Sequence, residues 1–133
     1  GVLDHVSFSE AKSILAEIRR VSTPDAYIFL SLRSTADSEC GRGEEVGENT
    51  YVLQEGYEQG MLQHFFDRSS IEELLAGYEI FDIEHLKREY PADFSVDKAY
   101  LQSSEGLKKQ IDLQDADFSR QYARWWLAAG RAE

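Results

Sequence analysis

Cysteine, proline and basic residues are scarce in this sequence. Cys40 is the single cysteine, so the chain cannot form an internal disulfide, and we predict an intracellular, cytoplasmic protein. The 133 residues carry 14 lysines and arginines against 25 aspartates and glutamates, a formal net charge of −11. Neutralising phosphate groups requires a basic patch, so this balance predicts no nucleic-acid partner and no binding to an anionic membrane surface.

Long apolar runs are also missing. No segment approaches the roughly 20 apolar residues of a membrane-spanning helix, and the N-terminus lacks the basic-then-apolar order of a signal peptide. Hydrophobic residues nevertheless make up 42% of the chain and aromatic residues 12%. This length and composition predict a single globular domain over residues 1–133 with a buried core.

A helix and a strand are predicted in the first 35 residues. Ser7 and Glu10 have the spacing of a capping box, in which two side chains each satisfy a free backbone N–H at a helix start. Apolar residues then recur at helical spacing until Pro24, which ends the helix. The run "AYIFLSL" (26–32) is almost continuously apolar, so we predict a strand that is buried on both faces.

Residues 34–60 are polar and glycine-bearing, and they show no sustained period. Such a stretch predicts a long loop that is functional or mobile. Ser69 and Glu72 repeat the capping-box pattern and predict a second helix, which Gly77 would end.

The remaining segments differ in how clearly they can be interpreted. "YEIFDIEHL" (78–86) is dense in β-branched and aromatic residues and predicts a second strand. The segment 91–121 has apolar residues that could mark a helix, but its glycine and aspartates weaken that prediction. The terminal "YARWWLAAGRA" (122–132) is a helix or a strand, since periodicity alone does not choose.

Three stretches resemble the Rossmann-like class of S-adenosylmethionine-dependent methyltransferases. "VLDHVSFSEAKSILAEIRRVSTPDAYIFLSLRST" (2–35) is similar to the region from the end of that family's fourth strand through its fifth, with Asp25 and Ala26 in place of a glycine pair. "NTYVLQEGYEQGMLQHFFDRSSIEELLAGYEIFDIEHL" (49–86) resembles a subgroup with a long loop and an "HFF" element after the fifth strand. "WWLAAGRA" (125–132) resembles the seventh strand.

The resemblance implies an α/β fold that is partial. It predicts a mixed sheet of the family's strands five, seven and six with flanking helices, an acceptor or lid loop at 34–65 and an insert at 91–121. The glycine-rich cofactor loop of the family, and the acidic residue that follows it, do not occur in this sequence, and "CGRGEEVGEN" (40–49) is not in the strand-to-helix context that such a loop requires. We therefore expect a C-terminal portion of a methyltransferase domain that lacks the glycine-loop half.

The resemblance also assigns candidate site residues. Leu3 and Asp4 would lie beside the cofactor, and His5 would be a general base, although in the isolated chain we expect His5 to be a frayed terminal residue. Arg33 could clamp a carboxylate of the acceptor or could be a solvated cation among the acids that follow it, and Thr35 follows the same strand.

Aromatic residues of the long loop would wall the acceptor pocket. These candidates for acceptor binding are Tyr51, Tyr57, His64 and Phe65. His64 could instead lie on the surface, and we interpret Phe66 as a hydrophobic staple on the second helix. His85 is expected to have no role, and the spacing of the three histidines predicts no metal site.

Two functions follow from these observations. The first is an S-adenosylmethionine-dependent methyltransferase acting on a small-molecule acceptor, with the cofactor bound in the full-length family and only weakly by this chain alone. The second is a non-catalytic module that self-associates, because the strand at 27–32 would have a bare edge that invites a homodimer.

Overall fold

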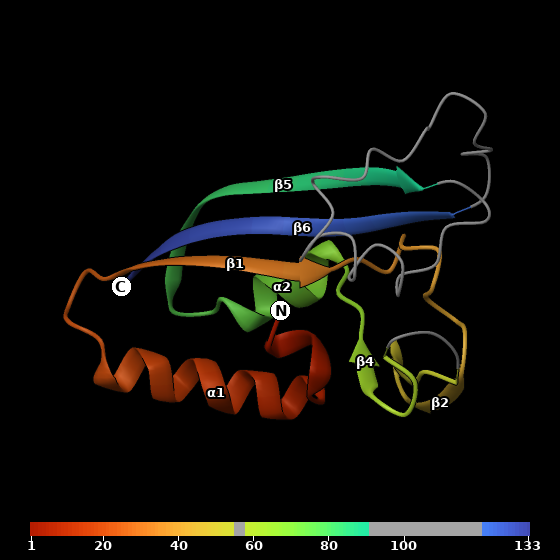
Figure 1. Ribbon diagram of the computed structural model, residues 1–133. Coiled ribbons are helices and arrows are strands. Elements are labelled where there is room, and N and C mark those ends of the chain that lie inside the picture. The colour runs from red at the N-terminus through yellow and green to blue at the C-terminus, as the bar shows by residue number, and fades with distance from the viewer. Residues whose placement is uncertain (55–57, 91–120) are drawn as a thin grey trace, which may run out of the picture.

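The computed structural model describes residues 1–54, 58–90 and 121–133, which form two small sheets and two α-helices around one core (Figure 1). Three elements precede the long loop: the 3₁₀-helix η1 (Leu3–His5), the helix α1 (Phe8–Val21) and the strand β1 (Tyr27–Arg33). The small sheet and the second helix follow, as β2 (Glu44–Gly47), β3 (Thr50–Val52), β4 (Leu62–His64) and α2 (Arg68–Leu74). The chain closes with the strands β5 (Tyr78–Tyr90) and β6 (Gln121–Ala132).

The first helix begins where the sequence predicts. The Ser7 hydroxyl accepts a hydrogen bond from the Glu10 backbone N–H, and the Glu10 carboxylate accepts one from the Ser7 N–H, which completes the capping box. Ala11 and Leu15 are fully buried, whereas Ile18 is 40% exposed and Val21 66% exposed. The apolar stripe is therefore covered over its first turns and open toward its C-terminal end.

The main sheet has the strand order β1-β6-β5. Both pairings are antiparallel, from Tyr27 opposite Arg131 to Arg33 opposite Trp125 in the first pair. The prediction of a mixed sheet is therefore wrong for the strands that the structure describes. The terminal segment, which periodicity left open, is a strand because it inserts between β1 and β5 and satisfies the backbone groups of both.

The prediction that β1 is buried on both faces is wrong. Leu32 is buried on the face toward the helices, and Ile28 and Leu30 are partly buried there. On the other face Tyr27 is 63% exposed and Phe29 75% exposed. An apolar run does not reveal whether anything covers its second face, and nothing among the described residues buries these two rings.

The region predicted as a structureless loop contains the second sheet. Its strand order is β2-β3-β4, all antiparallel, with Thr50 opposite His64 and a bulge between Glu45 and Gly47. These strands could not be predicted because they are three or four residues long, too short for a hydrophobic period to show. In Figure 1 this sheet lies at the carboxyl end of β1.

The second helix starts earlier than predicted. Asp67 is its N-cap, and its carboxylate accepts from the Ser70 N–H at 2.7 Å while the Ser70 hydroxyl accepts from the Asp67 N–H. The predicted capping pair of Ser69 and Glu72 is therefore wrong, since Asp67 and Ser70 form the capping box two residues upstream. Gly77 follows the helix with φ of +94°, a conformation that favours glycine.

The core lies between the inner face of the main sheet and the two helices. It is built from fully buried side chains that include Leu15, Leu32, Phe66, Ile71 and Leu75. Phe66 directly precedes the Asp67 cap and shares this cluster with Ile71 in the first turns of α2, the arrangement of a hydrophobic staple.

Some of the predicted segments lie outside the part of the chain that the structure describes. Residues 91–120 of the predicted insert, and Tyr57 of the predicted acceptor wall, lie outside the described residues, and residue 121 begins β6. In the described part of the chain, no helix has both the length and the apolar character needed to cross a membrane.

Candidate functional site

The structure brings η1, the end of β1 and β4 together. η1 contacts both strands, so Asp4, His5 and Arg33 meet at the carboxyl end of β1, the edge where the resemblance expects a site. Glu58 and Asp37 join them from the long loop. Two of these five residues, Asp37 and Glu58, were not singled out by the sequence.

Leu3 and Asp4 are both buried, at 7% exposure each. Leu3 belongs to the core cluster. The Asp4 carboxylate accepts from the Arg33 backbone N–H at 2.8 Å, and its second oxygen lies 3.3 Å from the amino group of Gly1. Asp4 therefore fixes η1 against the edge of β1, which places the neighbouring His5 side chain at the site.

His5 is held by a hydrogen bond on one ring nitrogen and is not a frayed terminal residue. Nδ1 lies 3.0 Å from the Leu62 carbonyl oxygen. A carbonyl only accepts, so Nδ1 must carry a proton and donate. Nε2 then faces the Glu58 carboxylate at 3.5 Å, and the two side chains are 28% and 20% exposed. The imidazole is thus oriented, and its Nε2 remains within reach of solvent.

Arg33 is neither a free clamp nor a solvated cation. Its Nε is 2.9 Å from Asp37, one terminal nitrogen is 2.7 Å from Glu39, and the other is 3.5 Å from Glu58. Burial alone would lower the pKa of Arg33, but the hydrogen bond to Asp37 and the charges of the three carboxyl groups reverse this and raise it. The guanidinium is therefore permanently charged and already occupied by carboxylates of its own chain.

Asp37 ties three segments together. Its side chain has no solvent exposure. Besides Arg33, it accepts from the backbone N–H of Glu39 at 2.9 Å and from that of Arg124 in β6 at 2.9 Å. This carboxylate joins the end of β1, the loop and β6, so the geometry around Arg33 depends on it.

The other predicted acceptor residues are distributed along the small sheet. Phe65 is completely buried and packs edge-on against Tyr51, with ring centroids 6.0 Å apart. Tyr51 is half-buried on β3, and the Thr35 backbone N–H donates to the Phe66 carbonyl at 3.0 Å. Tyr51 thus has a partly open aromatic surface, whereas Phe65 supports it from beneath.

His64 is buried at 4% exposure, so the surface alternative is excluded. Thr50 donates its hydroxyl proton to the Glu48 carbonyl, and its oxygen accepts from His64 Nδ1 at 2.7 Å. The ring stacks on Phe8 and meets Phe66 edge-on at 4.6 Å, and Nε2 has no hydrogen-bond partner among the described residues. Burial lowers the pKa of His64 despite the opposing charges of nearby carboxyl groups.

A neutral, buried His64 predicts loss of stability in mild acid. The unfolded chain takes up a proton near pH 6.5 while the folded chain resists until its lowered pKa is reached. The contribution of His64 is therefore complete above about pH 6.5 and is lost as the pH falls toward the folded pKa. Urea unfolding of wild type and His64→Asn, which keeps a donor for Thr50 but cannot titrate, should show a stability difference that narrows between about pH 7 and 5. A difference that is constant with pH would contradict a neutral buried His64.

The structure places His85 in β5 and Cys40 in the loop between β1 and β2. His85 lies within β5, hydrogen-bonds the buried Ser34 hydroxyl at 2.8 Å and stacks on Trp126 at 3.9 Å, so it is a packing residue in mid-strand. Burial and the charge of Asp37 raise the pKa of the Cys40 thiol. The thiol is therefore protonated near neutral pH and is a poor nucleophile.

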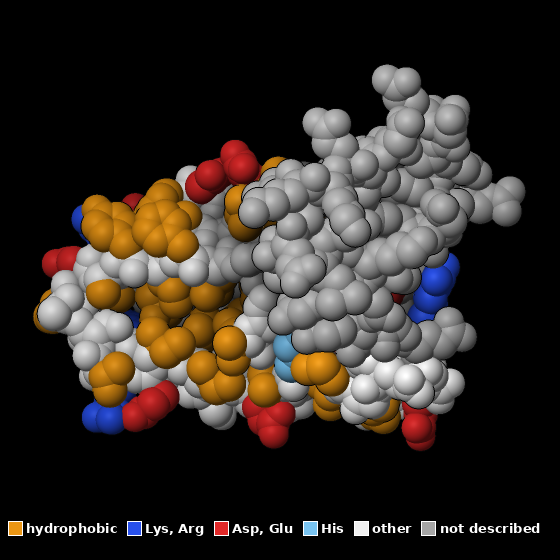
Figure 2. All heavy atoms as spheres, in the orientation of Figure 1, with side chains coloured by type: hydrophobic (Ala, Val, Ile, Leu, Met, Phe, Trp, Pro, Cys, Tyr) orange, Lys and Arg blue, Asp and Glu red, His pale blue; other side chains and the backbone are white. Residues whose placement is uncertain are grey.

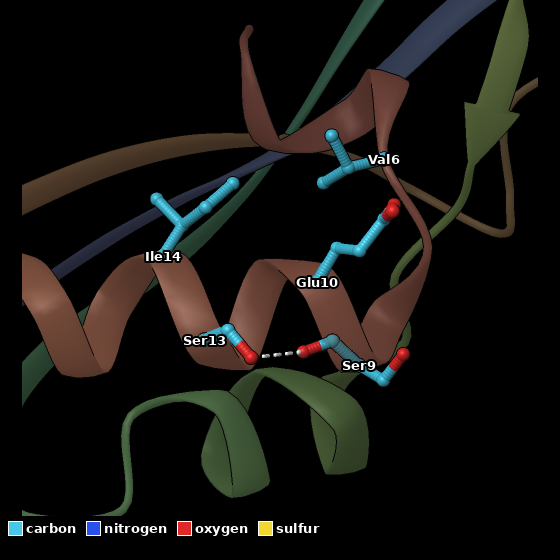
Figure 3. A pocket seen from close by; sticks show the side chains of 5 residues that line it. All are labelled: Val6, Ser9, Glu10, Ser13 and Ile14. Carbon is cyan, nitrogen blue, oxygen red and sulfur yellow. Dashed lines mark hydrogen bonds between the residues drawn. The ribbon is translucent and has the colours of Figure 1, made fainter.

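A shallow hollow of about 400 Å³ lies along α1, and neither His5, Arg33 nor Glu58 lines it. Val6, Ser9, Glu10, Ser13 and Ile14 line it, and Figure 3 shows Val6, Ile14 and the Glu10 carboxylate facing into it. Two of these residues are apolar and belong to the partly buried rim of the core. No group of three or more histidine, cysteine, aspartate or glutamate side chains in the described ranges could hold a metal ion.

A solved structure of a SAM-dependent methyltransferase from Methanosarcina mazei is similar to this chain, with a TM-score of 0.55 and 14% sequence identity. The match covers 95% of this chain and 52% of that one, so this chain spans about half the length of the methyltransferase. No family model matches the sequence, and no curated protein does. The likeness shows a methyltransferase-like α/β fold.

Proposed function

We propose that this chain is the C-terminal portion of an S-adenosylmethionine-dependent methyltransferase that acts on a small-molecule acceptor. The observation that carries the proposal is the fold match over 95% of the chain, together with the strand order β1-β6-β5. That order agrees with the family's strands five, seven and six, which the sequence stretches suggested separately. A cytoplasmic location is part of the same proposal.

The residues present do not fit a complete cofactor site. In the family a glycine-rich loop joins a strand to a helix and approaches the cofactor with its backbone. Here the glycine-bearing stretch 40–49 leads into β2, and a Cβ at Gly43 would collide with the Val52 carbonyl. Gly43 and Gly47 pack against β3, so the described residues offer no cradle of that kind, and S-adenosylmethionine would be held mainly by another part of the enzyme.

The contribution of this chain is then the acceptor side of the site. Asp4 and Leu3 fix η1, His5 presents Nε2 as a proton acceptor, and the Tyr51 ring offers a partly open wall. The Arg33 network holds the loop that supplies Glu58.

The reading frame upstream of Gly1 in the gene tests this proposal directly. We expect it to encode a glycine-rich loop between a strand and a helix, followed about 20 residues later by an acidic residue. A start codon immediately before residue 1 would instead favour the second candidate, a self-associating module without catalytic activity.

The open edge of β1 favours that second candidate and is compatible with the first. Among the described strands β1 pairs with β6 alone, and on its other edge Asp4 and Phe66 bind only the Arg33 end. Figure 2 shows hydrophobic side chains gathered along β1 and between β1 and α1. We propose that a two-fold axis pairs β1 antiparallel with its copy and doubles the three-stranded sheet.

Ile28→Lys is expected to convert the dimer into a monomer, because it places an unpaired charge among the apolar side chains on the inner face of β1, beside the proposed seam. Ile83→Lys is the matched control, since Ile83 is also a partly buried isoleucine but lies on β5, at the opposite edge of the sheet. Light scattering should report a monomer only for the Ile28 variant, with circular dichroism confirming that both remain folded. A wild-type chain that stays monomeric at high concentration would refute the β1 dimer.

A further inference from the structure

In its neutral form, His5 makes with Glu58 a pair of hydrogen-bond acceptors that face each other at 3.5 Å. The Leu62 carbonyl forces the proton of a neutral His5 onto Nδ1 at 3.0 Å, which leaves a lone pair on Nε2. That lone pair faces a Glu58 oxygen at 3.5 Å. The distance exceeds an N–H···O hydrogen bond of about 2.7–3.2 Å, so the two groups are placed to share a donor.

The carboxyl groups around His5 and Glu58 favour a positively charged donor. One guanidinium, Arg33, faces the three carboxyl groups of Asp37, Glu39 and Glu58, so the network is negative when all are ionised. Asp37 and Glu39 hold Arg33 at 2.9 and 2.7 Å, and its contact with Glu58 is the longest of the three, at 3.5 Å. Glu58 is therefore the carboxylate with the most capacity for another cation.

Solvent can reach this pair. The side chains of His5 and Glu58 are 28% and 20% exposed, while Asp37 has no exposure at all. The buried end of the network is saturated with hydrogen bonds, and its open end has one lone pair and one carboxylate. A ligand would meet only the open end.

We propose that the gap between His5 Nε2 and Glu58 binds the amino group of the acceptor, and that acceptors anchored there by a carboxylate are rejected. An ammonium group donates to both Nε2 and the carboxylate at once, an alcohol donates to one of them, and a carboxylate donates to neither. Because it names the acceptor class, the inference rests on the proposed function for its biological meaning. It replaces the expectation that Arg33 clamps a carboxylate.

Three probes of similar size test the inference on residues 1–133: benzylamine, benzyl alcohol and benzoate. Nitrogen-15 NMR of the histidine rings should show neutral His5 as the Nδ1–H tautomer and a saturable shift of its Nε2 with benzylamine. We expect a weaker response to benzyl alcohol and none to benzoate. An Nε2–H tautomer, or benzoate binding as strong as that of benzylamine, would overturn the inference.

Two glutamine variants separate the site from the general acidity of the chain. Glu58→Gln should weaken benzylamine binding at least about tenfold, because a charge-assisted hydrogen bond is lost. Glu44→Gln makes the same change of net charge on an exposed residue of β2 and should leave binding unchanged. Equal weakening in both variants would show that benzylamine follows bulk charge and would overturn the site.

These outcomes are independent of cofactor chemistry. Benzylamine bound at His5, together with a full-length protein that has no methyltransferase activity, would refute the proposed function and leave the amine site standing. Methyl transfer to a carboxylate acceptor without amine binding would do the reverse.

Discussion

Asp37→Ala is expected to lower the free energy of unfolding by about 3–5 kcal/mol, the cost of removing one partner from a buried ion pair. The Asp37 side chain has no exposure and accepts from the Arg33 guanidinium and from the backbone N–H groups of Glu39 and Arg124. The substitution leaves Arg33, which is only 20% exposed, without the carboxylate that binds two of its nitrogens. It also leaves the Arg124 backbone N–H in β6 without the Asp37 acceptor.

Urea unfolding followed by circular dichroism measures this loss. Asp82→Ala removes the same carboxylate from an exposed position on β5 and should change stability by no more than about 0.5 kcal/mol. Similar stabilities for the two variants would show that the Asp37 network is not structural, and the placement of Arg33 would then need another explanation.

Phe66→Ala is expected to cost about 3–5 kcal/mol as well, through loss of buried apolar surface and the cavity left behind. Phe66 is completely buried, and its ring contacts His64 and Phe8 edge-on. Its backbone is hydrogen-bonded on both sides, since its N–H donates to the Arg33 carbonyl and its own carbonyl accepts from Trp126 Nε1 at 3.0 Å. The side chain thus packs at the point where β1, α1 and the small sheet meet.

Phe29→Ala is the matched control for Phe66. The same ring is removed from a position that is 75% exposed on the outer face of β1, so the cost should be within about 0.5 kcal/mol. A Phe29 variant that is destabilised as strongly as the Phe66 variant would mean that the outer face of the main sheet is covered in solution.

Rules that use only neighbouring residues predicted one helix start and one strand correctly. The Ser7 and Glu10 capping box and the strand at 78–86 are confirmed. A cap depends on residues three positions apart, and a strand of this length can be recognised by its content of β-branched and aromatic residues. The same rule failed at Ser69, where Asp67 and Ser70 offer an equally good box two residues earlier. Only the packing of Phe66 against the core decides between the two starts.

Packing and pairing could not be predicted from the sequence. β1 is an apolar run, and the exposure of Phe29 depends on what other segments place on that face. β2, β3 and β4 are too short to show a period, and they become strands because each satisfies the backbone of its neighbour.

In the candidate site, too, some residues could be predicted from the sequence and others could not. His5 and Arg33 were predicted because both lie in the stretch 2–35, which resembles a known family. Glu58 and Asp37 were missed because their roles come from distances across the fold, 3.5 Å to His5 and 2.9 Å to Arg33. The spacing of Asp37 four residues after Arg33 is informative in a helix, but here it lies in a loop, where that spacing predicts no contact.

Calorimetric titration of S-adenosylmethionine into residues 1–133 tests the central claim most directly, namely that this chain forms the acceptor side of a methyltransferase whose cofactor is held elsewhere. We predict a dissociation constant above about 1 mM, because residues 1–54, 58–90 and 121–133 offer no glycine-rich cradle between a strand and a helix. A micromolar dissociation constant would contradict the account, since it would place a complete cofactor site within these residues.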